Sequence, residues 1–360
     1  MKKIKVLHTE WSDGWGGQEI RIINEMIALR EKGVEVFLAC KENSQIKIKA
    51  EENNIKVFSL PFKGNIDFKT MFLLSKIIKD NKINIINTHS GKDTWVGGIA
   101  SKISGSKFIR TRHLSNRIRS SRINFINEIA DYIFTTGESV KEDMIKFNRI
   151  NPNKIMSIPT GIDDKLFDPT KYDKIESRKY FDIKDDEIVI GIVAILRMFK
   201  RHDLFIQAAE KLIGEYSDKK LKFIIAGDGP QRETIERLIK KLGLNSSIIL
   251  LGHVKDVPLL LSALDVFVLT SDSKEGVPQS VMQALLMNKK VVATDVGSTS
   301  DLYSNNNFKL IKPESIDEIV NSVKTLISED EKDNRSIIVN NFSKKVMTDK
   351  IYKIYSQILN

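Results

Sequence analysis

Short apolar runs alternate with longer amphipathic stretches along almost the whole chain, and no other feature constrains the fold as strongly. This alternation is typical of βα units around a parallel sheet, because each buried strand needs a helix that returns the chain to the next strand. The first half contains seven such runs: Ile4–Leu7, Val34–Ala39, Lys56–Leu60, Ile83–Asn87, Phe108–Arg112, Tyr132–Thr135 and Lys154–Ile158. Seven strands are enough for one doubly wound domain.

The alternation restarts after a stretch rich in proline and aspartate, Ile158–Lys174. Six further runs follow: Ile188–Leu196, Lys222–Ala226, Ile248–Leu251, Val266–Thr270, Lys290–Ala293 and Phe308–Ile311. A chain of 360 residues with 41% hydrophobic content exceeds the usual size of one hydrophobic core. We therefore predict an α/β protein with two Rossmann-like domains, residues 1–165 and 166–343, followed by an amphipathic helix within residues 344–360.

Charge and cysteine content limit the partners and the compartment. The formal net charge of +10 favours an anionic partner, which could be nucleic acid, a membrane surface or a phosphorylated substrate. The single cysteine, Cys40, excludes an intramolecular disulfide framework and fits a reducing cytoplasm. The first apolar stretch is broken by His8 and Glu10, so it is too short for a signal peptide. No later segment reaches the ~20 apolar residues that span a bilayer, so we expect a cytoplasmic protein that meets a membrane only from its surface.

A glycine-rich loop follows the first predicted strand. In open α/β sheets ligands bind at the carboxyl ends of the strands, so the loops there are where chemistry is expected. Gly14, Gly16 and Gly17 precede an amphipathic helix, whose N-terminus favours anions, and glycines let a ligand approach the backbone. Their spacing does not match the Gly-x-Gly-x-x-Gly fingerprint, which counts against a nicotinamide dehydrogenase. A tight turn without ligand contact remains the alternative.

Two cations follow the first strand of the second domain. Arg197 and Lys200 lie three residues apart at the carboxyl end of a central strand, where they could hold a diphosphate and stabilise its charge as it leaves. A solvated basic turn is the alternative. The segment Ala226–Pro230 follows the next strand and, taken alone, predicts only a turn.

The most informative segment lies between Ser271 and Leu285. A loop with Glu275 leads to Pro278, which is typical of the first turn of a helix. Backbone N–H groups of that turn, together with the helix dipole, predict an anion site. Gln283 lies about one and a half turns further, so it could reach a second part of the same ligand.

The ordered set of motifs resembles retaining glycosyltransferases of family four. The motifs that carry the resemblance are Ile158–Asp163 with Phe167, Leu196-Arg197-x-x-Lys200, Ala226–Pro230, Leu251–Val254, Glu275–Pro278, Ala293–Gly297, and in the first domain Gly16–Glu19 and Thr111–Leu114. The resemblance covers nearly the whole chain. It implies the GT-B architecture, in which two Rossmann-like domains face a central cleft and the last helix crosses back to the first domain.

The same resemblance implies which residues act. Arg197 and Lys200 would bind the donor diphosphate and stabilise the leaving nucleotide, and Glu275 would contact the donor sugar. His113 would project toward the transferred sugar. The implied donor-binding positions are Gly16, Gly17, Gly229, His253, Val254, Gly276, Val277, Pro278 and Gln283.

One position departs from the family pattern. The family usually has a second glutamate eight residues after the first, and this chain has Gln283 there. An amide still donates and accepts hydrogen bonds, so if this position binds ribose hydroxyls the loss is on the order of 1 kcal/mol. We expect activity to be retained because Glu275, Arg197 and Lys200 are all present.

We expect neither a metal nor a cofactor, the nucleotide-sugar being a co-substrate. No Asp-x-Asp motif occurs, and the five histidines are scattered without zinc spacing. The resemblance implies transfer with retention at the anomeric carbon, in which the donor phosphate can take the acceptor proton. Uridine donors are the commoner case in the family, so we expect a UDP-linked hexose.

A basic stretch without acidic residues runs from Ser101 to Asn127. Such a cluster could dock an anionic membrane, a lipid diphosphate or a phosphorylated saccharide, whereas a solvated basic face is the alternative. Nucleic acid is disfavoured because no recognised binding module accompanies the charge. The residues expected at a membrane surface are Lys102, Lys107, Arg117, Arg119 and Arg122.

Three functions remain open at this point. The first is a glycosyltransferase acting on a saccharide or lipid-linked acceptor, in bacterial surface polysaccharide or lipopolysaccharide synthesis. The second is a sugar-nucleotide epimerase of the same architecture, against which the ordered motif set argues. The third is a non-catalytic nucleotide-binding relative, which only Gln283 supports.

Overall fold

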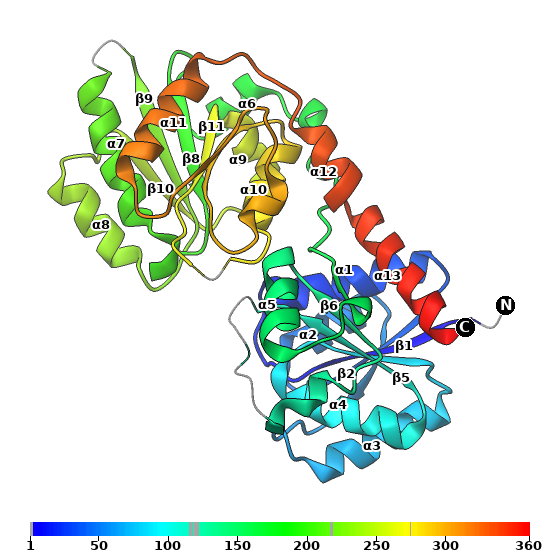
Figure 1. The fold of residues 1–360 in the computed structure, drawn as a ribbon. Helices are drawn as coiled ribbons and strands as arrows, with labels where there is room; N and C mark the ends of the chain where they lie inside the picture. Colours follow the sequence, from blue (N-terminus) through cyan, green and yellow to red (C-terminus); the bar gives the residue numbers. More distant parts are fainter. Residues whose placement is uncertain (1–2, 115–117, 119–121, 217–218, 274) are drawn as a thin grey trace. The chain divides into compact units, whose positions relative to one another are not determined.

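The computed structural model describes residues 3–114, 118, 122–216, 219–273 and 275–360. The chain divides into two compact units (Figure 1). The N-terminal unit contains residues 1–161 and 344–360, and the C-terminal unit contains residues 162–343. Each unit is built around one parallel sheet that has helices on both faces.

The N-terminal unit has a seven-stranded sheet in the order β3-β2-β1-β4-β5-β6-β7. Its strands are β1 (Lys5–Glu10), β2 (Glu35–Cys40), β3 (Lys56–Ser59), β4 (Ile85–Thr88), β5 (Lys107–Arg112), β6 (Tyr132–Thr135) and β7 (Ile155–Ser157). The order reverses between β1 and β4, which pair in parallel from Val6 opposite Ile85 to Thr9 opposite Thr88. This reversal is the switch point of a doubly wound sheet.

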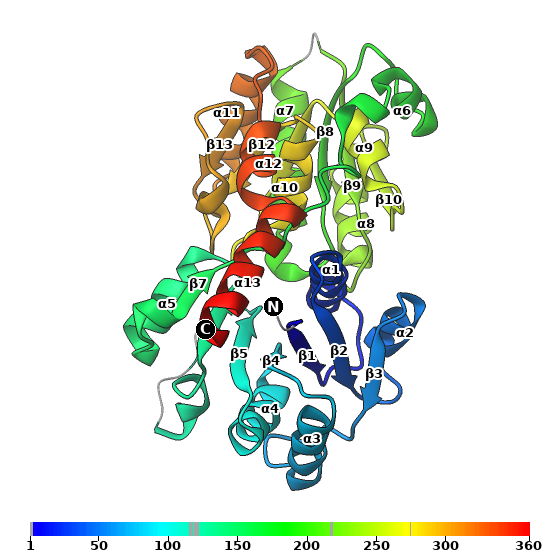
Figure 2. The same ribbon diagram turned by 90° about the vertical axis from the view of Figure 1, so that its right-hand side faces the viewer.

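Two apolar layers hold the N-terminal unit together. Helices α1 (Gly17–Glu31), α2 (Gln45–Glu52) and α13 (Lys344–Leu359) cover one face of the sheet, whereas α3 (Phe68–Asp80), α4 (Gly91–Ser104) and α5 (Glu138–Asn148) cover the other (Figures 1 and 2). The chain therefore returns to its first unit for the last helix. That return is specified by apolar residues of α13 at helical spacing: Met347, Ile351, Ile354 and Tyr355 are all buried.

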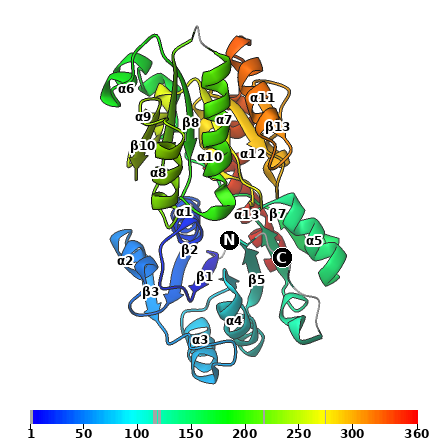
Figure 3. The same ribbon diagram turned by 90° about the vertical axis from the view of Figure 1, so that its left-hand side faces the viewer.

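The C-terminal unit has a six-stranded sheet in the order β10-β9-β8-β11-β12-β13. Its strands are β8 (Ile188–Val193), β9 (Leu221–Ala226), β10 (Ile248–Gly252), β11 (Val266–Leu269), β12 (Lys290–Thr294) and β13 (Phe308–Ile311). One face carries α7 (His202–Glu215), α8 (Arg232–Lys241) and α11 (Ile316–Ser328); the other carries α6 (Lys174–Tyr180), α9 (Val257–Ala263), α10 (Gln279–Leu286) and α12 (Arg335–Phe342) (Figures 1 and 3).

The predicted fold class is confirmed, because every predicted apolar run overlaps a strand of one of the two parallel sheets. The run Ile188–Leu196 is shorter as a strand than predicted. It ends at Val193 because the chain beyond it bonds to the loop after β9, where the Leu196 N–H donates to the Asp228 carbonyl at 3.0 Å. Cys40 is a buried free thiol at the end of β2. No helix within the described residues is long and apolar enough to cross a membrane.

Replacing Ile351 of α13 by alanine tests whether the last helix stabilises the N-terminal unit. Ile351 is completely buried, so the change is expected to lower the free energy of unfolding by about 2–5 kcal/mol. Urea unfolding followed by tryptophan fluorescence reports on this unit alone, because the three tryptophans are Trp11, Trp15 and Trp95. The exposed Lys353→Ala is the control and should change stability by less than about 0.5 kcal/mol. Equal stability of the two variants would contradict this packing.

Candidate active site

The loops after β8 and β11 are fastened to each other at the switch point of the C-terminal sheet. Thr270 follows β11, and its hydroxyl oxygen lies 2.9 Å from the carbonyl oxygens of both Lys200 and Arg201. The Asp272 N–H donates to the Phe199 carbonyl at 2.9 Å. A short 3₁₀ turn, Met198–Lys200, is thereby held directly against the end of β11. Ligands of doubly wound sheets bind at this place.

A buried ion pair lies across these two loops. The ammonium of Lys200 donates to Oε1 of Glu275, and the Ser271 hydroxyl donates to the same oxygen at 2.6 Å. The two charged side chains are only 12% and 8% exposed. Burying two charges costs free energy unless they are paired and hydrogen-bonded, so this pair is costly to build without a use for it. An ammonium has three N–H donors, which leaves Lys200 able to bind an anion as well.

The two predicted phosphate-binding cations differ in their surroundings. Arg197 is exposed and makes no ion pair with any carboxylate of the described residues. The nearby Arg201, in contrast, is tied to Asp203 at 2.9 Å and to Glu314 at 2.8 Å, which raises the pKa of its guanidinium. Arg201 therefore holds the loop, whereas Arg197 keeps its guanidinium available.

Two glycines let neighbouring backbones pass close to the segments that carry Arg197 and Glu275. Gly297 has a φ of +62°, and a Cβ placed there would lie 1.9 Å from the Glu275 carbonyl oxygen. Gly229 has a φ of +155°, and its Cβ would lie 2.8 Å from the Leu196 carbonyl oxygen. Only glycine fits both positions. Gly229 thus fixes the residue just before Arg197, and Gly297 fixes Glu275.

The predicted donor residues after Glu275 lead into α10. The helix begins at Gln279 with Pro278 as its N-cap, one residue later than predicted. Val277 and Pro278 are buried, whereas Gly276 and Gln283 are half-buried and therefore accessible in part. His253 and Val254 follow β10 at the edge of the sheet, where His253 is exposed and Val254 packs on the core.

In the N-terminal unit two carboxylates shape the predicted glycine loop. Oε1 of Glu10 accepts the N–H groups of Trp11 at 2.9 Å and Ser12 at 2.8 Å, and its other oxygen accepts from the Gln18 amide. The Gly16 N–H donates to the Glu19 carboxylate at 2.9 Å, which caps α1 at its N-terminus. Gly17 is the first residue of that helix. Burial, with Asp93 close by, raises the pKa of Glu10 to about 8.

Three histidines form a hydrogen-bonded chain behind this loop. His8 belongs to β1, His89 follows β4 and His113 follows β5, and these strands are neighbours in the sheet. Nδ1 of His8 lies 2.9 Å from Nε2 of His89, and Nδ1 of His89 lies 2.9 Å from Nε2 of His113. His8 and His89 are buried, and His113 is partly exposed at the end of the chain.

All three imidazoles are neutral at pH 7. Burial lowers the pKa of His8 to about 3, and it lowers the pKa of His89 and of His113 well below the ordinary 6.5. The positive charge of the buried Arg21 lowers the latter two further. A neutral imidazole has one N–H donor and one acceptor nitrogen. Both hydrogen bonds in the row of three histidines must therefore point the same way, each ring donating to the next.

The family resemblance points to His113 but not to His8 or His89. Histidines of a metal site recur at short spacings along the sequence, whereas these three meet across strands that are far apart in sequence. The available signal was positional: each histidine stands at or just after the carboxyl end of a predicted strand. Parallel pairing brings such ends together.

The predicted basic surface is described only in part. Lys102 is exposed and Lys107 is half-buried, and their ammonium groups lie 3.1 and 4.0 Å from the Asp131 carboxylate. Arg117, Arg119 and the side chain of Arg122 lie outside the described residues. Across the described part of the chain, no group of three or more His, Cys, Asp or Glu side chains is arranged to hold a metal ion.

Family comparisons cover most of both units. The sequence profile of the family described as "Glycosyl transferases group 1" matches residues 173–342, and that of "Glycosyltransferase Family 4" matches residues 15–166. The chain belongs to the group 1, family 4 glycosyltransferases. The candidate residues Arg197, Lys200 and Glu275 lie within the first match, and His113 lies within the second.

Characterised relatives align with this glycosyltransferase over most of its length. The UDP-Gal:alpha-D-GlcNAc-diphosphoundecaprenol alpha-1,3-galactosyltransferase of Escherichia coli is 26% identical, covering 98% of this chain and 97% of that protein. The GPI3 subunit of the phosphatidylinositol N-acetylglucosaminyltransferase of Saccharomyces cerevisiae is 24% identical, covering 87% of this chain and 72% of that protein.

Solved structures share the GT-B fold of this glycosyltransferase. A glycosyltransferase from Rickettsia africae superposes with a TM-score of 0.91 at 20% identity, and each chain is covered completely. Anabaena HepE in complex with UDP and glucose superposes with a TM-score of 0.81 at 20% identity, covering 98% of this chain and 100% of that one. At this level of identity the likeness establishes the architecture.

Gly297→Ala tests the close approach of backbone to Glu275. The variant is expected to lose at least about 3 kcal/mol of stability, because left-handed strain adds to the clash with the Glu275 carbonyl. Gly243→Ala is the matched control, since Gly243 also has a positive φ of +69° but open space around its Cβ, and it should cost about 1–2 kcal/mol. Hydrogen exchange measured by mass spectrometry on peptides of the C-terminal unit gives the loss of stability in each variant. Equal losses would show that the contact with Glu275 does not matter.

The histidine chain predicts an acid-sensitive N-terminal unit. Because the pKa of His8 is about 3 in the fold against an ordinary 6.5, the unfolded chain binds more protons in that window, and stability falls as pH falls. The buried Glu25, whose pKa is raised to about 7, acts in the opposite sense between pH 7 and 4.5. The difference in the free energy of unfolding between wild type and His8→Leu isolates the pH dependence that His8 contributes, since both proteins retain Glu25.

Urea unfolding followed by tryptophan fluorescence at a series of pH values measures this difference. The stability of wild type relative to His8→Leu should decrease steadily from pH 6.5 toward pH 3. Parallel curves for the two proteins would mean that His8 titrates alike in the folded and unfolded chain.

Proposed function

We propose that this glycosyltransferase moves a hexose-type sugar from a UDP-sugar to a saccharide or lipid-linked acceptor, with retention of anomeric configuration and without a metal ion. The observation that carries the proposal is the buried pair of Lys200 and Glu275 across the loops after β8 and β11. The relatives support the substrates: one is named for UDP-Gal and a diphosphoundecaprenol acceptor, and Anabaena HepE was solved with UDP and glucose. We assign the reaction to the cytoplasm and to surface polysaccharide or lipopolysaccharide synthesis.

The donor diphosphate would bind between the two available cations. Lys200 offers N–H donors beyond the one used by Glu275, and Arg197 offers an exposed guanidinium that pairs with no carboxylate in the described part of the chain. The N-terminal turn of α10 adds backbone N–H groups with the positive end of the helix dipole. Together these groups would stabilise the negative charge that develops on the leaving UDP.

The sugar would lie against Glu275, whose second oxygen accepts no hydrogen bond from the described residues and could accept one from a hydroxyl of the donor. In the proposed step the bond between the anomeric carbon and the diphosphate oxygen breaks, and the acceptor oxygen bonds to that carbon from the same face. The acceptor hydroxyl proton passes to the departing phosphate oxygen. The cations compensate the diphosphate charge, so the step requires no metal ion.

His113 would contribute a neutral imidazole. Nε2 of His8 is buried without a hydrogen-bond partner among the described residues. An orphaned N–H is rarer in folded proteins than an unused acceptor, so His8 should carry its proton on Nδ1 and donate toward His89. His89 then carries its proton on Nδ1 and donates to Nε2 of His113. His113 therefore carries its own proton on Nδ1, the nitrogen that does not contact His89. His113 would thus donate a hydrogen bond to the sugar or acceptor rather than supply a positive charge.

Activity assays on the full chain test the proposal. The purified protein should consume a UDP-sugar in the presence of a diphospholipid-linked or saccharide acceptor, and Lys200→Ala or Glu275→Ala should reduce kcat by about 10²–10³-fold. The rate should be unchanged by EDTA, and nuclear magnetic resonance of the product should show the anomeric configuration of the donor.

Three controls make the assay decisive. Lys240→Ala removes an exposed lysine of the same unit and should leave the rate unchanged. Gln283→Glu restores the carboxylate usual in the family and should stay within about tenfold of wild type. Conversion of the donor into an epimer without acceptor, inversion at the anomeric carbon, or full activity of Glu275→Ala would each refute the proposal.

A further inference from the structure

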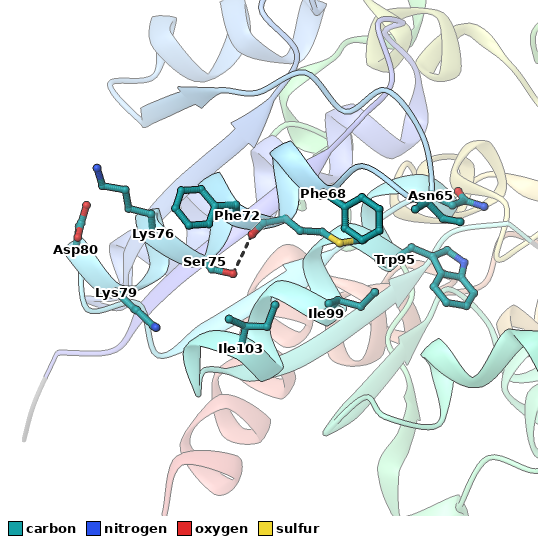
Figure 4. Close-up of a pocket in the computed structure, with 12 residues that line it drawn as sticks. Asn65, Phe68, Phe72, Ser75, Lys76, Lys79, Asp80, Trp95, Ile99 and Ile103 are labelled. Atoms are coloured by element: carbon teal, nitrogen blue, oxygen red, sulfur yellow. Dashed lines mark hydrogen bonds between the residues drawn. The ribbon is translucent and has the colours of Figure 1, made fainter.

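An apolar groove lies between α3 and α4 on the N-terminal unit. It has a volume of about 580 Å³. Figure 4 shows aromatic and aliphatic side chains along its length, with Phe68 and Phe72 from α3 and Trp95, Ile99 and Ile103 from α4. The groove lies within one unit of the fold, so its shape does not depend on the other unit.

The rim of this groove exposes large apolar side chains to solvent. Ile66 and Phe68 are each 77% exposed, Phe72 is 71% exposed and Ile103 is 58% exposed. Phe68 and Phe72 stand four residues apart on α3, so they lie on the same face of that helix. Single exposed apolar residues are ordinary, but a contiguous patch beside an apolar groove marks an interaction surface.

The groove offers almost no hydrogen bonding along its walls. The hydroxyl of Ser75, which lines it, already donates to the Met71 carbonyl at 2.9 Å. The other polar groups lie at its two ends, where Figure 4 shows Lys76, Lys79 and Asp80 at one end and Asn65 at the other. Sites for sugars or nucleotides need convergent polar groups, so the walls of this groove suit hydrocarbon.

Lysines stand at the groove and on the adjoining chain. Lys76 and Lys79 line the groove, Lys69 is a further exposed lysine of α3, and Lys63 is exposed in the segment before that helix; no carboxylate of the described residues forms an ion pair with any of the four. Asp67, on the same stretch, is buried and caps α3 by accepting from Thr70 at 3.1 Å. Asp80 is therefore the one exposed acid between residues 61 and 80. Hydrocarbon-binding walls framed by unpaired cations match the surface of an anionic lipid bilayer.

We propose that the α3–α4 groove docks this protein on an anionic phospholipid bilayer. Ile66, Phe68, Phe72 and Ile103 enter the acyl region, and the flanking lysines contact the lipid phosphates. A second copy of the chain fits less well, because a two-fold interface would bring the lysines of both copies together. This docking does not depend on the proposed transfer reaction, since it concerns a different surface and is measured without any sugar donor.

Co-sedimentation of the full chain with lipid vesicles tests the docking. One set of vesicles contains equal amounts of phosphatidylcholine and phosphatidylglycerol, and the other contains phosphatidylcholine alone. The wild-type chain should sediment with the anionic vesicles, and salt should weaken this binding. Phe68→Gln combined with Phe72→Gln should weaken it by at least about tenfold, because two aromatic side chains lose their burial in lipid.

Matched pairs on the C-terminal unit separate docking from general surface properties. Ile175→Gln with Tyr180→Gln removes two apolar side chains of α6 that are 59% and 73% exposed, and it should leave vesicle binding unchanged. Lys76→Glu with Lys79→Glu should reduce binding by at least about tenfold. Lys240→Glu with Lys241→Glu on α8 changes the net charge equally and should reduce it far less.

Trp95 provides a direct probe of the groove itself. In a chain carrying Trp11→Phe and Trp15→Phe it is the remaining tryptophan, and lipids with a quencher on the acyl chain should reduce its fluorescence. Unchanged circular dichroism of the exposed-residue variants serves as the folding control. Wild-type binding by the double phenylalanine variant, no binding by the wild type, or self-association that this variant abolishes would overturn the proposal. The last result would assign the groove to a second copy of the chain.

Discussion

The burial of the central strands on both faces is the constraint on which the rest of the structure depends. Helices cover both sides of each parallel sheet, so apolar side chains fill the strands, and polar side chains that serve a ligand are left to the strand ends. Both sheets reverse their strand order next to their first strand, and both collect unusual polar groups there. In the C-terminal unit these are Lys200 and Glu275, and in the N-terminal unit they are three histidines.

The two units handle burial in opposite ways. The C-terminal unit pairs Lys200 with Glu275 and adds a hydrogen bond from the Ser271 hydroxyl. The N-terminal unit keeps its histidines neutral, since burial lowers their pKa values and Arg21 disfavours a further positive charge. In the reaction we propose, Lys200 would interact with the departing diphosphate, whereas the neutral His113 would donate a hydrogen bond to the sugar without competing for the phosphate.

Much of the fold and part of the candidate site could be predicted from the sequence. The strands were predictable because apolar runs bounded by amphipathic stretches report burial directly. Arg197, Lys200 and Glu275 could be selected because they follow strands and match a family pattern. The positions of Gly229 and Gly297 could be read as turns, but their use as close-approach points for Leu196 and Glu275 could not. That use depends on backbone segments from other strands.

The sequence by itself determined two Rossmann-like sheets, an amphipathic last helix and the family, because these depend on local periodicity and ordered motifs. Only the tertiary structure decided that His8, His89 and His113 meet, that Glu275 pairs with Lys200, and that α3 and α4 leave an apolar groove with a basic rim. The physical reason is the same in each case. Hydrogen bonding, charge pairing and cavity shape depend on distances between residues far apart in the chain, and parallel strand order, not sequence spacing, sets those distances.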